Sequence, residues 1–166
     1  MKQIDINKHT KYSLELIFSE ADKMSNQLLK SLSENVNKSF ILFAFFSSLF
    51  SYSFLKVVQS DFLYITLLIG SIVGCVVIRK NLFPFVINFN GALPEKMLDP
   101  YFDEFEGETL EKEYLATQIQ SYNSAMNLNE QTIKKMVKRF NNSILVVIAS
   151  FVLFGIVYFY LFIKCL

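Results

Sequence analysis

The chain has 166 residues, 52% of them hydrophobic and 16% aromatic, and a formal net charge of +1. A charge this close to zero argues against a dedicated nucleic-acid-binding protein. The two cysteines lack CxxC spacing and there is one histidine, His9, so neither a zinc site nor a disulfide framework is indicated. We expect no metal and no cofactor.

Residues 1–39 form a polar arm with a helical pattern of apolar residues. Their three- and four-residue spacing predicts an amphipathic helix. Because acidic residues offset its lysines, we expect this cytoplasmic arm to pack on another helix rather than to lie flat on a membrane. The apolar face consists of Leu14, Ile17, Ala21, Met24, Leu28 and Leu32.

Three apolar segments follow, at residues 40–58, 62–78 and 144–163. A membrane-spanning helix needs roughly 17–25 such residues, and all three segments meet this length. The last contains fifteen Leu, Ile, Val and Phe residues, which contribute on the order of −5 to −9 kcal/mol to membrane insertion. Only residues 59–61 separate the first two segments, so residues 40–78 predict a transmembrane hairpin. The predicted fold class is an all-α integral membrane protein with three transmembrane helices.

The basic residues predict the orientation of these helices. Six Lys residues precede the first span, and eight Lys or Arg residues lie between the second and third spans, so one side receives fourteen of the sixteen. Because Lys and Arg concentrate on the cytoplasmic side of membranes, the N-terminus is expected inside and the C-terminus outside. The protein would then be a multi-pass protein of the inner (cytoplasmic) membrane.

Two pairs of small residues within the hairpin each have two possible roles. Gly70 and Gly74 form a GxxxG motif, which lets helices approach closely, either within the chain or between subunits. Ser47 and Ser51 lie on one helical face and are candidates for lining a pore. Their hydroxyls can instead bond to carbonyls of their own helix.

Residues 79–143 form a second cytoplasmic segment. Its first part contains all three prolines and is expected to be irregular. Residues 85–89 could form one short strand, and an acidic stretch after them is interpreted as a solvated face. Beyond it, a coiled-coil-like seam predicts a long helix that leads into the third span (144–166). Asn127 and Glu130 also resemble a capping box, so a break near Asn127 remains open. The candidate packing or oligomer residues of this seam are Leu115, Ile119, Tyr122, Met126, Asn129, Ile133, Met136 and Phe140.

Six basic residues flank the second and third spans, and we call them the basic collar. They are candidates for contact with an anionic ligand or with lipid headgroups. The alternative is that they only fix the orientation of the spans. The basic collar consists of Arg79, Lys80, Lys134, Lys135, Lys138 and Arg139.

Motifs of catalysis and nucleotide binding are absent from the sequence. There is no GxSxG, HExxH, P-loop or GxGxxG motif, and no Cys–His or Ser–His catalytic arrangement can be built around the single histidine. We therefore expect a protein that is not an enzyme.

The stretch "QIQSYNSAMNLNEQTIKKMVKRFNNSILVVIASF" (118–151) combines spaced asparagines, a basic end and a following span. With the arm and the hairpin before it, this layout resembles the small multi-span membrane effectors of bacterial antiphage defence, such as the SLATT-type and Pycsar transmembrane effectors. The resemblance implies a homo-oligomer in the lipid bilayer. Such an oligomer senses a nucleotide signal or a soluble cytoplasmic partner and then disrupts the membrane, for example through a pore.

Two other functions fit the same features. The chain could be a membrane anchor or accessory subunit that recruits a soluble partner through its cytoplasmic helices. It could also be a phage-type exclusion or immunity protein that acts on another membrane protein.

Overall fold

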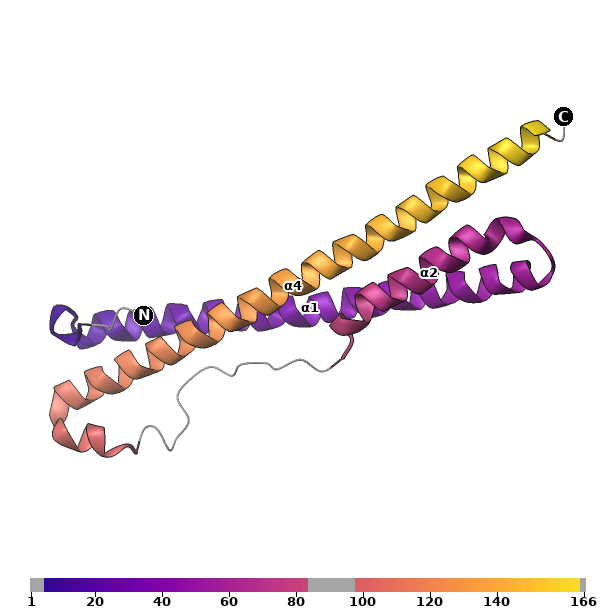
Figure 1. Ribbon diagram of the computed structural model, residues 1–166. Helices are drawn as coiled ribbons and strands as arrows, with labels where there is room; N and C mark the ends of the chain where they lie inside the picture. Colours follow the sequence, from indigo (N-terminus) through magenta and orange to yellow (C-terminus); the bar gives the residue numbers. More distant parts are fainter. Residues whose placement is uncertain (1–4, 84–97, 165–166) are drawn as a thin grey trace. The chain divides into compact units, whose positions relative to one another are not determined.

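The computed structural model describes residues 5–83 and 98–164, and the regular elements within them are all helical. Two long helices, α1 (Lys11–Val58) and α4 (Gly107–Lys164), enclose the shorter α2 (Ile65–Ile78) in the sequence (Figure 1). The possible strand at 85–89 lies outside the described residues. The remaining elements are short 3-10 helices: η1 (Ile6–Lys8), η2 (Phe62–Tyr64), η3 (Arg79–Asn81) and η4 (Pro100–Glu104).

Three helical segments are long and apolar enough to cross a membrane: Lys11–Val58, Phe62–Asn81 and Gly107–Lys164. This confirms the helical class and the number of candidate spans. Only 6% of the most apolar window of the third segment is buried within the chain. An apolar surface left this open suits a hydrocarbon environment far better than water.

Helix α1 joins the predicted arm and the first span without a break. Thr10 caps its start: its Oγ1 accepts a hydrogen bond from the Ser13 amide at 3.1 Å. Neither glycine nor proline occurs between Lys11 and Val58, so nothing in the sequence interrupts the helical hydrogen bonds. Residues of the predicted arm and of the first span therefore belong to one helix of 48 residues.

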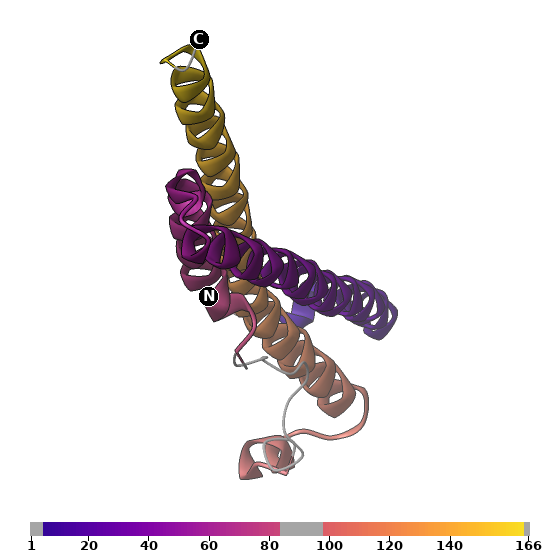
Figure 2. The ribbon, with the colours of Figure 1, turned by 90° about the vertical axis from the view of Figure 1, so that its right-hand side faces the viewer.

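Helix α4 is also continuous, which answers the question left open at Asn127 (Figures 1 and 2). The Asn127 side chain donates to Asn123 Oδ1, one turn earlier, at 3.4 Å. It thus bonds along the helix surface instead of capping a new helix. At 1.5 Å per residue, the 58 residues of α4 extend about 87 Å.

Buried positions recur every seven residues along both long helices, the spacing of a coiled-coil seam. On α1, Leu14, Ala21 and Leu32 of the predicted face are buried, Ile17 and Met24 are 41% and 57% exposed, and Ser25, which was not predicted, is buried. A serine in the seam lets two helices come closer than a methionine would. The seven-residue series are Ser25, Leu32, Ser39, Phe46 and Ser53 on α1, and Asn129, Met136, Ser143 and Ser150 on α4.

The described residues group into two compact units. We call residues 5–32 with 98–132 the arm unit, and residues 33–83 with 133–164 the span unit. Helices α1 and α4 each contribute one part to both units.

In the arm unit, α1 and α4 run in the same direction. Lys11 forms an ion pair with Glu111 at 2.6 Å, and eleven residues further on in both helices the Tyr122 hydroxyl donates to Asp22 Oδ1 at 3.1 Å. The Phe18 ring meets Tyr122 edge-on at 5.3 Å. These contacts advance together along both helices, as expected of a parallel pair.

In the span unit, α2 runs back beside α1 after a tight turn in which Ser60 adopts a positive φ of 69°. The two glycines of the GxxxG motif face other helices of the same chain. A Cβ atom at Gly70 would overlap the side chain of Ser150 on α4, and one at Gly74 would overlap the Phe46 ring on α1. Close packing of α2 therefore requires both glycines.

We predict that Gly74→Ala lowers the stability of the span unit by about 1–3 kcal/mol, because the added methyl group would overlap the fully buried ring of Phe46. Reversible unfolding in mixed detergent micelles measures this effect. The matched control is Gly155→Ala on α4, since a Cβ at that position would meet no other helix within 4 Å. Equal stability of the two variants would contradict the packing described.

Candidate functional site

A buried asparagine connects three helical segments of the span unit. The Asn81 side chain is fully buried, and its Nδ2 donates to Ser39 Oγ on α1 at 3.1 Å and to the Met136 carbonyl on α4 at 3.0 Å. Its Oδ1 accepts from Arg139 Nη1 at 3.5 Å. We call these four residues the Asn81 node.

Local structure explains how Asn81 reaches this position. It ends η3, which extends α2 by one turn, and the Leu82 amide bonds to the Arg79 carbonyl at 3.0 Å. Ser39 and Met136 both belong to the seven-residue series of buried positions. The Ser39 hydroxyl also donates to the Asn35 carbonyl at 2.8 Å, so it serves as both donor and acceptor. Both N–H groups of the amide are thus satisfied, as a buried polar group requires.

The six residues of the basic collar differ in their exposure. Arg139 is half-buried and turned toward Asn81. The other five collar residues are exposed. Lys134 and Lys138 border a shallow pocket of about 420 Å³ on α4, together with Ile133, Val137, Asn141 and Asn142. The predicted ligand residues therefore include one that also takes part in the packing of the helices.

Ser47 and Ser51 lie beside a pocket of about 280 Å³ between α1 and α2, which Ser71 and Cys75 also line. The Ser47 hydroxyl donates to the Phe43 carbonyl at 2.9 Å, and that of Ser51 to the Ser47 carbonyl at 3.0 Å. Within the single chain both hydroxyls thus bond to their own helix. This is the alternative that sequence reasoning gave for serines in an apolar helix.

The seam predicted on α4 lies on the covered side of the helix. All eight of its residues are buried or half-buried, with Ile119, Asn129 and Met136 the most covered.

In the arm unit, burial and then the hydrogen bond to Asp22 raise the pKa of the Tyr122 hydroxyl. A raised pKa means that folding favours the neutral hydroxyl, so this contribution to stability is complete below the ordinary tyrosine pKa and is lost at higher pH.

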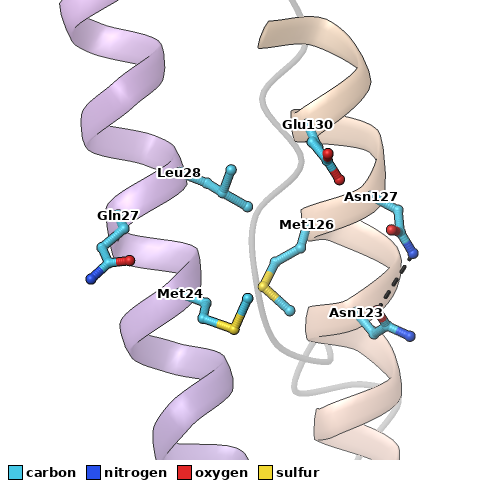
Figure 3. A pocket seen from close by; sticks show the side chains of 7 residues that line it. All are labelled: Met24, Gln27, Leu28, Asn123, Met126, Asn127 and Glu130. Carbon is cyan, nitrogen blue, oxygen red and sulfur yellow. Dashed lines mark hydrogen bonds between the residues drawn. The ribbon is translucent and has the colours of Figure 1, made fainter. Parts of the chain in front are cut away.

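An open groove of about 420 Å³ lies between α1 and α4 in the arm unit (Figure 3). Met24 and Met126 point toward each other across it, and Leu28 completes its apolar floor. The polar residues that line the same groove are Gln27, Asn123, Asn127 and Glu130. Flexible methionine side chains suit a surface that adapts to a partner.

Among residues 5–83 and 98–164, no group of three or more His, Cys, Asp or Glu side chains is arranged to hold a metal ion. No known protein family, curated protein or solved structure matches this chain. The chemistry of the site therefore has to be argued from its own residues.

Sequence reasoning did not identify Asn81 or Ser39 as functional candidates. Asn81 follows Arg79 and Lys80, so it resembles any polar residue at the end of an apolar segment. Ser39 could have been found, because it lies seven residues after Leu32 and seven before Phe46. That series becomes visible once serine is allowed in the seam.

We predict that Asn81→Ala destabilises the span unit by about 1–3 kcal/mol, because two buried hydrogen bonds are lost and a small void remains. Unfolding in mixed micelles provides the measurement. Asn37→Ala on the exposed face of α1 is the matched control, and it should change little. If both variants unfold alike, the node does not hold the helices together.

Proposed function

We propose that this protein is a non-enzymatic effector of the inner membrane. In this proposal it acts as an oligomer, its arm unit senses a cytoplasmic ligand or partner, and α1 and α4 carry the response to the spans. An oligomeric pore in antiphage defence is the form of this activity that the layout of the chain favours.

The continuity of α1 and α4 is the observation that carries the proposal. Each runs without interruption from the arm unit into the span unit, with buried positions at a constant seven-residue spacing. A continuous helix transmits a shift or rotation along its length, whereas a glycine- or proline-rich hinge would absorb it. In the Asn81 node, one side chain bonds to both helices in the span unit.

The proposed orientation places the N-terminus and the basic collar in the cytoplasm and the hairpin turn outside. The aromatic residues fit it, since Tyr52, Tyr64 and Tyr158 gather near the end of the spans opposite to the collar. Tyrosine is enriched where a bilayer meets water.

We predict that a cysteine at Ser60, in an otherwise cysteine-free chain, reacts with a membrane-impermeant maleimide in intact cells. A cysteine at Ser33 should react only after the cells are permeabilised, because the arm would lie inside. Both positions are exposed, so access to the reagent decides the labelling. The opposite pattern would reverse the orientation.

We predict that liposomes carrying the full-length protein leak a trapped dye much faster with Asn81→Ala than with the wild-type protein or the Asn37→Ala control. Weakening the contact that holds α4 should favour the active arrangement, if the protein is an effector. An outcome in which all three preparations stay sealed would count against membrane disruption.

A second candidate function is supported by the groove of the arm unit. An accessory subunit could bind a helix of a soluble partner against Met24, Leu28 and Met126, as amphipathic helices bind in apolar grooves. Such a protein would leave liposomes sealed and would copurify with one soluble partner. Met24→Glu should abolish that copurification, while Leu16→Glu on the exposed surface outside the groove should not.

A further inference from the structure

The contact between Arg139 and Asn81 is the weakest in the node. The guanidinium donates to the amide oxygen at 3.5 Å, whereas the amide itself donates at 3.0 and 3.1 Å. Hydrogen bonds of this type are strongest near 2.9 Å. Arg139 is therefore held to a neutral partner by a long bond that a better acceptor could replace.

The span unit as a whole is rich in positive charge. Residues 33–83 and 133–164 contain nine Lys or Arg residues but only two acidic ones, Glu34 and Asp61. Asp61 belongs to the hairpin turn at the far end of α2, and neither acidic residue forms a salt bridge within the described parts of the chain. The half-buried guanidinium thus lacks a carboxylate partner among the described residues.

Three further basic residues are neighbours of the Asn81 node along the chain. Arg79 and Lys80 precede Asn81 within η3, and Lys135 is one turn before Arg139 on α4. All three are exposed. Arginine binds phosphate with two parallel charge-assisted hydrogen bonds, which are roughly twice as strong as bonds between neutral groups. A phosphate group would therefore compete well with the Asn81 amide.

We propose that Arg139 exchanges between the Asn81 amide and a phosphate-bearing anion, for which Arg79, Lys80 and Lys135 complete the binding site. Binding of the anion withdraws the guanidinium from Asn81 and loosens the node. The anion is a soluble phosphate compound or a phospholipid headgroup, since the collar borders the apolar segments. That loosening activates the protein rests on the proposed function, whereas the exchange itself does not.

The test uses the full-length protein in phosphatidylcholine nanodiscs, with inorganic pyrophosphate as the soluble probe and calorimetry as the measurement. Arg139→Gln keeps a donor for Asn81 but removes the charge, and it should weaken binding by at least about tenfold. Lys138→Gln changes the net charge equally at an exposed neighbouring position and should weaken binding only about twofold.

Asn81→Ala separates exchange from simple attraction of charge. Removal of the competing amide should strengthen pyrophosphate binding by about two- to fivefold, whereas a purely structural Asn81 predicts unchanged or weaker binding. If this variant does not fold, the comparison of Arg139→Gln with Lys138→Gln still decides the question of the site.

Nanodiscs that contain phosphatidylglycerol form the second arm of the experiment. If the headgroup is the ligand, they should weaken pyrophosphate binding in the wild type but much less in Arg139→Gln. Binding that is unaffected by this lipid identifies a soluble anion. Equal effects of Arg139→Gln and Lys138→Gln would overturn the proposal and leave the collar as an orientation signal. Dye leakage is measured separately, so binding without leakage would contradict only the proposed function.

Discussion

Within the span unit, the buried amide of Asn81 fixes the position along their axes at which α1, η3 and α4 contact one another. Both N–H groups of Asn81 are used, one for α1 and one for α4. Apolar side chains slide past one another at little cost, but an amide donor has few acceptors within reach. A single buried asparagine can fix helix register in this way. The close approach that the amide needs depends in turn on Gly70 and Gly74, which bring α2 against its neighbours.

Small and polar residues have a particular role in such a unit. Lipid is as apolar as leucine, so apolar contact alone does not drive helices together in a membrane. The seam positions Ser39 and Ser53 on α1, with Ser143 and Ser150 on α4, are all buried. Their small side chains permit dense packing, and those of Ser39, Ser143 and Ser150 donate to carbonyls one turn earlier. The span unit is thus held by close fit and a few hydrogen bonds.

The sequence predicted the features that depend on local pattern. Hydropathy located three helices long enough to cross a membrane, and heptad spacing located the covered face of α4. The predicted arm face missed Ser25, because hydrophobicity does not select a small polar residue, although Ser25 is buried while the predicted Ile17 is 41% exposed. The Asn81 node could not be predicted, because it joins residues 42 and 55 positions apart. The partners of the GxxxG motif were equally hidden, since a glycine does not specify which helix approaches it.

The parallel course of α1 and α4 has a consequence for biosynthesis. A chain synthesised from its N-terminus completes the hairpin long before Met136 exists, so the Asn81 amide has no carbonyl of α4 to meet. Gly70 likewise has no Ser150 to pack against until α4 has been synthesised. The nascent hairpin must remain with this face open until the last helix arrives. Any factor that shields the hairpin during this interval would therefore recognise a surface that the finished protein conceals.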